Sequence, residues 1–184
     1  MFFAFLGAHL LRTVHGRDAV AHAGVSSFRL SERGDINFTF GIVDRTRQTA
    51  VPWGDDFHCW IDCDGYVIDL MAPLYREMWH DSSRRTEILP RKIFQKPRRE
   101  RSANILTLGA NGAFFVQEDV AYTRKIKSLV EDYAQLNPEF DVYVACEAWY
   151  RPAPGPMAQV FTLQTRCGRQ EQVALEAFEV SGAW

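Results

Sequence analysis

The sequence lacks a marked excess of charge of either sign. Its 184 residues include 21 lysines and arginines against 23 aspartates and glutamates, which gives a formal net charge of -2. A balance of this kind leaves the molecule without an overall field that would attract nucleic acid or an anionic membrane surface. We therefore expect nucleic acid to be a partner only if a local basic patch exists.

Long hydrophobic runs are also missing. The apolar run at the start of the chain ends at Arg12, after about eleven residues, which is too short to span a bilayer. It has neither the charged leading segment nor the small-residue cleavage site of a secretory signal peptide. We therefore expect a cytoplasmic protein with no membrane partner, whose four cysteines are reduced thiols.

Apolar and aromatic residues are plentiful. They make up 47% and 13% of the sequence, which is enough material for one core in a single domain over residues 1–184. The opening run predicts a helix that ends near His15, with Gly16 as its stop. Because the first eight residues are apolar on every side, we expect this helix to be buried all round.

Runs of β-branched and aromatic residues alternate with turn residues along much of the remaining chain. These patterns predict strands at 19–30, 36–43, 112–117 and 140–146, hairpins at 57–70 and at 157–180 around Cys167-Gly168, a helical turn at 72–80 and an amphipathic helix over 120–136. Between 81 and 102 Arg, Lys, Pro and Ser prevail, which predicts a long, exposed, basic connection. A helix followed by mostly antiparallel strands and a second helix argues for an α+β fold.

The stretch FHCWIDCDGYVIDL, residues 57–70, carries the clearest chemistry. Asp64-Gly65 between alternating apolar runs predicts a two-residue hairpin turn. With that turn, His58 and Asp69 are diagonal neighbours on one face of the hairpin, ~5–8 Å apart at Cβ. With Cys63-Asp64 as the turn they would face each other directly, and a three-residue loop would break the relation.

An aspartate that accepts a hydrogen bond from one imidazole nitrogen fixes the tautomer and stabilises the imidazolium, and the other nitrogen is left free as a base. His58 would then be the general base and acid, and Asp69 its orienting partner. Trp60 lies on the same face and is expected to wall the active cleft. The plainer alternative is a strand histidine that any nearby polar group satisfies, with Asp69 an ordinary strand-end residue.

Two short segments also carry a family resemblance. His58-Cys59-Trp60 and Tyr66-Val67-Ile68-Asp69 resemble the histidine and aspartate segments of transglutaminase-like proteins. Those proteins belong to the papain-like cysteine peptidase superfold, which also includes the arylamine N-acetyltransferases. A narrower resemblance, to an uncharacterised bacterial family of this superfold, rests on Phe2-Phe3, Gly7-Ala8, Leu10-Leu11 and Ala23-Gly24.

The resemblance covers roughly the first seventy residues, and it implies both a fold and an activity. The implied fold is papain-like, with a buried N-terminal helix packed on a mostly antiparallel sheet. The implied activity is thiol-dependent acyl transfer or amide hydrolysis, with His58 and Asp69 as the catalytic pair. The substrate would be a peptide, an amine or an acyl compound, and no cofactor is implied.

The resemblance also places a nucleophilic cysteine at the start of the first helix, where the helix dipole and His58 would lower its pKa. The sequence has Met1 at that place, and its first cysteine is Cys59. Two explanations are open. The natural start lies upstream and carries the nucleophile, or the protein is an inactive member that keeps only the fold. The absence of an N-cap residue before Phe2 favours an upstream leader.

None of the four cysteines has the position expected of the nucleophile. On a strand, Cys59 points away from the face that carries His58. Cys63 and Cys167 lie at turns, and Cys146 lies on an apparent core strand, where a buried thiol is the usual state.

A structural zinc site formed by His58, Cys59, Asp62 and Cys63 is an alternative to the catalytic interpretation. Such sites ordinarily use two pairs of ligands. Cys59 and Cys63 form one pair, but strand alternation excludes His58 from it and no second pair is evident. We therefore expect no metal.

The segment 84–101 offers a different kind of function. It concentrates basic residues, and in a non-catalytic binding module it would contact an acidic partner or nucleic acid. Phe94 is its only aromatic residue, so a base-stacking platform is unsupported. A solvated loop is the plainer interpretation of this segment.

Overall fold

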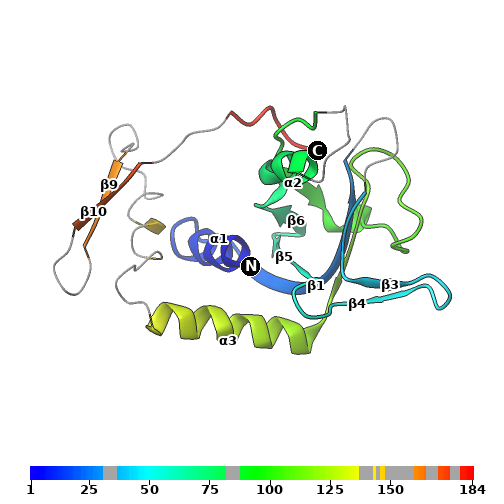
Figure 1. Ribbon diagram of the computed structural model, residues 1–184, viewed down its shortest axis with the longest axis horizontal. Helices are drawn as coiled ribbons and strands as arrows, with labels where there is room; N and C mark the ends of the chain where they lie inside the picture. The colour runs from blue at the N-terminus through cyan, green and yellow to red at the C-terminus, as the bar shows by residue number, and fades with distance from the viewer. Residues whose placement is uncertain are drawn as a thin grey trace.

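The computed structural model of the protein describes residues 1–30, 37–81, 88–136, 143, 146–147, 160–164, 170–174 and 179–184. Within them, the helices are α1 (Phe2–Thr13), α2 (Tyr75–Asp81) and α3 (Val120–Leu136), and the short 3-10 turns are η1 (Ala72–Leu74) and η2 (Arg98–Glu100). The strands are β1 (Ala19–Arg29), β2 (Asn37–Phe40), β3 (Ile42–Asp44), β4 (Thr49–Val51), β5 (His58–Cys63), β6 (Tyr66–Asp69), β7 (Phe94–Pro97), β8 (Phe114–Glu118), β9 (Val160–Gln164) and β10 (Gln170–Ala174). Helices packed on an antiparallel sheet confirm the α+β class (Figure 1).

The long strand β1 organises the main sheet. Its first half pairs with β5, and its second half pairs with β2 and β8. From β5 the sheet continues to β6 and β7, and all of these ladders are antiparallel. Gly24 pairs with His58 of β5 and also with Glu118 of β8, so this one residue joins the strand that carries the site to the opposite edge of β1.

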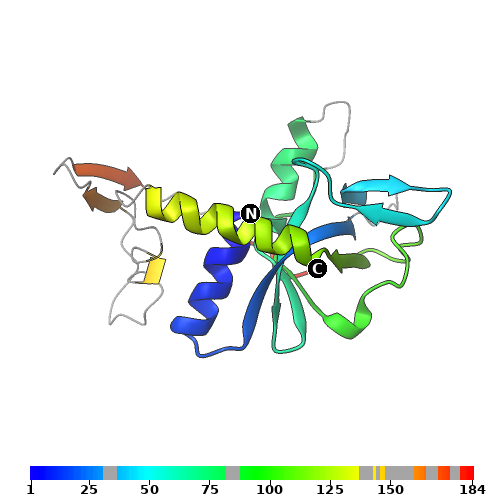
Figure 2. The ribbon, with the colours of Figure 1, turned by 90° about the horizontal axis from the view of Figure 1, so that it is seen from below.

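Helices α1 and α3 cover one face of the sheet (Figures 1 and 2). Small side chains of β1 and α1 share one buried cluster there: Ala19, Ala21, Ala23, Ala4 and Ala8. Because these side chains project little, the helix backbone approaches the sheet closely, and a Cβ on Gly7 would lie only 2.3 Å from Leu70 Cδ1. This close packing fixes where α1 begins relative to β5.

The opposite face carries a second core that is rich in aromatic rings. It is built from Phe28, Leu30, Trp60, Val67, Ala72, Tyr75, Phe94, Phe114 and Val116. Helix α2 lies on this side, so α2 and α3 are on opposite sides of the sheet (Figure 1). The buried polar side chains His58 and Asp69 lie beside this aromatic core.

Several elements match the sequence-based expectations. α3 has the predicted bounds, β1 and β8 lie within a residue or two of the predicted strands, and the hairpin at 57–70 is formed by β5 and β6. β9 and β10 pair as the predicted C-terminal hairpin, whose Cys167-Gly168 turn lies outside the described residues. In both views this hairpin lies at one end of the molecule, away from the main sheet (Figures 1 and 2).

The expectation that the first helix is buried all round is wrong. Ala4, Gly7 and Ala8 are buried, but Phe3 is 49% exposed. The sheet covers one side of α1 and α3 flanks it, so an apolar side chain on the remaining side faces solvent. The helix ends at Thr13, slightly before the predicted end, and Gly16 follows with a positive φ of 62°.

The predicted exposed connection at 81–102 also needs correction. Its later part contains the edge strand β7, which pairs with β6, and its Leu89 and Phe94 are buried. Charged residues between the apolar ones gave the segment the composition of a loop. An edge strand tolerates such charges because one of its edges faces solvent.

The strand predicted over 140–146 is wrong at the residues that the structure describes there. Tyr143, Cys146 and Glu147 are helical, and the rest of that range lies outside the described residues. Tyr143 and Glu147 lie beside α1. Both contact His9 of α1, Tyr143 with ring centroids 4.9 Å apart and Glu147 at 2.5 Å from His9 Nε2.

The lengths of the described helices decide whether any of them could cross a membrane. α3, with 17 residues, is the longest helix among the described ranges. Neither it nor any other helix in those ranges is long and apolar enough to cross a membrane.

We predict that Gly24→Ala strongly destabilises the protein. A Cβ at this position would lie 2.2 Å from the backbone oxygen of Gln117, and backbone relieves such a clash only by shifting β8. The free energy of unfolding should fall by about 1–3 kcal/mol, measured by urea denaturation. Gly109→Ala is the matched control, because nothing lies within 4 Å of the added methyl group. Equal stability of the two variants would contradict the tight β1–β8 packing.

Candidate active site

The β5–β6 hairpin sets the positions of His58 and Asp69. Asp64 and Gly65 have positive φ angles of 50° and 81°, as a two-residue type I′ turn requires. Cys63 pairs with Tyr66 across this turn, which confirms the predicted register. His58 therefore begins β5 and Asp69 ends β6 on the same face of the sheet.

His58 and Asp69 form a buried ion-pair geometry. His58 Nε2 lies 2.9 Å from Asp69 Oδ2, and the two side chains are 6% and 0% exposed. Because a carboxylate only accepts hydrogen bonds, Nε2 is the nitrogen that carries the proton. The imidazole is stacked on Phe40 with ring centroids 4.6 Å apart and meets the edge of Phe28, so its plane is fixed. Its other nitrogen, Nδ1, has no hydrogen-bond partner among the described residues.

Tyr75 completes the environment of the carboxylate. Its hydroxyl donates a hydrogen bond to Asp69 Oδ2 and lies 3.2 Å from His58 Nε2. The backbone N–H of Met71 donates to Asp69 Oδ1 at 2.8 Å. Burial raises the pKa of Tyr75 well above its ordinary value, and Asp69 raises it further by its charge and hydrogen bond, so the hydroxyl stays protonated as a donor.

Sequence reasoning did not identify Tyr75. It follows Asp69 by only six residues, and η1 turns the chain so that the first residue of α2 returns to the carboxylate. The available signal was the predicted helical turn after Pro73, together with the need of a buried aspartate for several donors.

A cavity of about 200 Å³ adjoins the pair. It is lined by Met1, Phe3, Ala4, Phe40, Asp55, Phe57, His58, Cys59, Asp69, Leu70 and Met71. The start of α1 is thus a wall of the space beside the imidazole, and the N-terminus lies near the middle of the molecule in both ribbon views (Figures 1 and 2). Trp60 does not line this cavity. It is 2% exposed within the aromatic core, so the expectation that it walls the cleft is wrong.

The described cysteines have the properties of unreactive thiols. Cys59 packs in the cluster beneath α1, and burial raises its pKa to about 11. Burial also raises the pKa of Cys63 and of Cys146. Cys63 adjoins the hairpin turn, and Cys146 is helical rather than on the predicted core strand. Cys167 lies outside the described residues.

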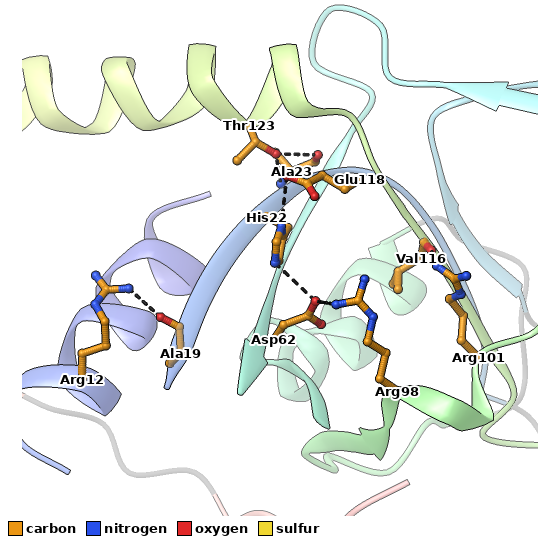
Figure 3. A network of polar contacts seen from close by, with 10 residues as sticks. All are labelled: Arg12, Ala19, His22, Ala23, Asp62, Arg98, Arg101, Val116, Glu118 and Thr123. Carbon is orange, nitrogen blue, oxygen red and sulfur yellow. Dashed lines mark hydrogen bonds and ion pairs between the residues drawn. The ribbon is translucent and has the colours of Figure 1, made fainter. Parts of the chain in front are cut away.

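A second polar network crosses the sheet near the site (Figure 3). His22 of β1 lies between two carboxylates, with Nε2 3.3 Å from Asp62 and Nδ1 3.1 Å from Glu118. Arg98 of η2 pairs with Asp62. Burial lowers the pKa of His22, but the hydrogen bonds and charges of the two carboxylates raise it by more, so the net shift is upward.

Sequence reasoning gave His22 no partners, because its two carboxylates come from strands that are distant along the chain. The two carboxylates bind opposite nitrogens of the ring instead of converging on one point. Within the described part of the chain, no group of three or more His, Cys, Asp or Glu side chains is arranged to hold a metal ion.

The basic segment 84–101 is largely bound to the protein where it is described. Arg91 pairs with Glu77, Lys92 lies over the Trp184 ring at 4.7 Å, and Arg98 pairs with Asp62. Residues 84–87 lie outside the described ranges. These intramolecular contacts reduce the positive charge that the segment can offer to an acidic partner.

Removal of the Tyr75 hydroxyl should weaken the buried pair. Tyr75→Phe leaves Asp69 Oδ2 with one donor fewer, and hydrogen bonds to charged groups contribute about 1.5–3 kcal/mol. We expect the free energy of unfolding to fall by about 1–3 kcal/mol, measured by urea denaturation at neutral pH. Tyr66→Phe is the control, because Tyr66 is 42% exposed. A stable Tyr75→Phe protein would show that Asp69 does not depend on this donor.

The His22 network should make stability depend on pH. A raised folded pKa means that protonated His22 stabilises the fold below its ordinary pKa of 6.5, and that this contribution is lost as the pH rises through the folded value. His22→Gln should therefore cost about 1 kcal/mol at pH 5.5 and less at pH 8.5, measured by urea denaturation. His15→Gln, at an exposed position, should show no such trend. The opposite trend for His22→Gln would refute the upward shift.

Comparison with known proteins identifies a family but no activity. The family described as "Protein of unknown function (DUF2026)" matches residues 1–184. A crystal structure described as that of a genomics target is similar to the chain, with a TM-score of 0.82 and 29% sequence identity. The similarity covers 100% of this chain and 83% of that one. No curated protein matches the sequence. The match over the full 184 residues shows that the chain belongs to the DUF2026 family of proteins of unknown function.

Proposed function

We propose that this protein carries the base and orienting groups of a thiol-dependent acyl-transfer or amide-hydrolysing enzyme. The observation that carries the proposal is the buried His58–Asp69 pair beside a cavity at which α1 begins. Asp69 fixes Nε2 as the protonated nitrogen, so Nδ1 is the basic one. A general base with a fixed ring and a free nitrogen beside a cavity is suited to activating a nucleophile.

The nucleophile that fits this arrangement is a thiol at the start of α1. The helix dipole favours an anion at that end, and the first turn of α1 holds no acidic residue that would oppose it. Met1 lines the cavity together with His58, so a thiol presented there would be close to the imidazole. Cys59 and Cys63 are buried, Cys146 is half-buried, and the pKa of each thiol is raised, so we propose that the nucleophilic thiol is presented at the start of α1 and not by any of these three cysteines.

In the proposed reaction, Nδ1 of His58 accepts and returns the proton in each step. The thiol proton passes to His58 Nδ1, and the thiolate sulfur forms a bond to the carbonyl carbon of the substrate. Protonated His58 gives this proton to the leaving amine as the C–N bond breaks, which leaves a thioester. Water or a second amine then loses its proton to Nδ1 and attacks the thioester carbon, and the returning proton regenerates the thiol.

We further propose a papain-like, transglutaminase-like architecture for the chain. The support is the order of the parts: a helix whose start lines the site, then a strand with the histidine, then a strand with the aspartate. Tyr75 is an additional part of this site. It acts as a positioning residue, because it contacts the carboxylate and touches no reacting atom.

The test is to place a thiol where the proposal needs one. In a protein with Met1→Cys behind a short Gly-Ser leader, the new thiol should ionise readily, because cysteines beside an imidazolium at a helix N-terminus have pKa values of roughly 3.5–7.5. We expect iodoacetamide to label this residue at pH 6 at least about tenfold faster than in the same protein with His58→Ala. Mass spectrometry of peptides measures the label at each cysteine.

The native cysteines provide an internal control. Cys59 should remain unlabelled under these conditions, because its pKa is about 11. Equal labelling of the new thiol with and without His58 would refute the proposal, since the imidazole would then have no influence at the start of α1.

A further inference from the structure

The cavity beside His58 is lined by both aromatic rings and carboxylates. Phe3, Phe40 and Phe57 contribute aromatic rings, and no lysine or arginine is among the described residues that line it. The wall also holds His58, which pairs with Asp69, and Met1, whose terminal ammonium makes no ion pair with Asp55 in the described part of the chain. Aromatic faces and unpaired carboxylates both attract organic cations.

One of the two carboxylates in the wall is inaccessible to a ligand. Asp69 is completely buried, and its oxygens accept from His58, Tyr75 and the Met71 N–H. Asp55, in contrast, is exposed and makes no hydrogen bond or ion pair with another residue in the described ranges. Asp55 is the carboxylate that a substrate can reach.

The loop that holds Asp55 is fixed at three points. Trp53 and Asp56 exchange two backbone hydrogen bonds, of 3.1 and 2.9 Å. Asp56 Oδ1 accepts from the N–H of Gly41 at 2.7 Å, so this neighbouring carboxylate is already used by the fold. The hydroxyl of Tyr122 in α3 donates to the carbonyl of Gly54 at 2.5 Å. Asp55 therefore lies on a preorganised turn at the wall of the cavity.

The remaining rim of the cavity is apolar. Met1, Phe3 and Leu70 all line it, and they are 45%, 49% and 39% exposed. Large apolar side chains exposed together at a pocket mark a surface for an apolar part of a ligand. The rim and Asp55 thus offer two different contacts to one molecule.

We propose that this cavity is a subsite for a primary ammonium group carried on an apolar chain, with Asp55 as the residue that determines this specificity. The ammonium pairs with the Asp55 carboxylate, and the apolar chain packs on the phenylalanine rings and the rim. This inference rests on the proposed function for the meaning of the subsite, which would select among the substrates of that reaction. The binding itself requires neither the thiol nor catalysis.

A binding experiment with three matched probes tests the subsite. 4-Phenylbutylamine, 4-phenylbutanol and 4-phenylbutyrate share one apolar frame and differ in charge. Methyl-labelled methionine reports their position by NMR, because Met71 lines the cavity and Met78 of α2 does not. We expect the amine to shift the Met71 signal with a Kd about three- to tenfold lower than that of the alcohol, and the carboxylate to bind more weakly than both. Added salt should raise the Kd of the amine and should leave the Kd of the alcohol nearly unchanged.

Substitution of the carboxylate supplies the decisive comparison. Asp55→Asn should bring the Kd of the amine to within about twofold of that of the alcohol and should leave the Kd of the alcohol unchanged. Asp132→Asn, at an exposed position on α3 outside the cavity wall, makes the same charge change and should keep the preference for the amine. Both substituted side chains are exposed, so neither change removes a buried contact.

Three results would overturn the inference. They are equal binding of the three probes, absence of a Met71 shift with the amine, and a preference for the amine that survives Asp55→Asn. None of these results bears on the labelling test of the His58 pair, because binding is measured on the unsubstituted chain and requires no thiol at the start of α1. Conversely, a cation preference that depends on Asp55 would stand even if His58 failed to activate a thiol at the start of α1.

Discussion

The buried carboxylate of Asp69 is the constraint on which the rest of the structure depends. Removing an ionised carboxylate from water costs several kcal/mol, and this cost is offset only if its oxygens are fully hydrogen-bonded. The three donors come from β5, from the backbone after β6 and from the start of α2. The hairpin register, the η1 turn and the position of α2 must therefore all be correct at once for Asp69 to be tolerated.

The site lies where the two cores of the molecule meet. On one side of the sheet, alanines and glycine let α1 approach closely, and on the other side aromatic rings fill the space. His58 is the first residue of β5, and its ring stacks on Phe40 on the aromatic side of the sheet. The cavity next to the ring is bounded by the start of α1. This arrangement places a buried imidazole with a fixed plane beside the N-terminal end of a helix, and both a helix N-terminus and a protonated imidazole favour a nearby anion.

Local patterns made the hairpin and its dyad predictable. The Asp64-Gly65 turn fixes the register over the few residues between His58 and Asp69, and α3 has strong helical periodicity. Features that depend on the path of the chain in space were not predictable. Tyr75 reaches the carboxylate only because η1 turns back, and His22 meets Asp62 and Glu118 only because β1 pairs with both β5 and β8. Strand β7 was hidden because its charges resemble those of a loop.

The double pairing of Gly24 also has a consequence for motion. Its neighbour Ala23 exchanges hydrogen bonds of 2.9 and 3.0 Å with the hydroxyl of Thr123, so β5, β8 and the start of α3 are all fastened within two residues of β1. Amide hydrogens in such a region exchange with solvent only through extensive opening of the fold. His58, which pairs with Gly24, therefore lies in a firmly held part of the described structure, whereas Met1 and Phe3 at the start of α1 are exposed to solvent.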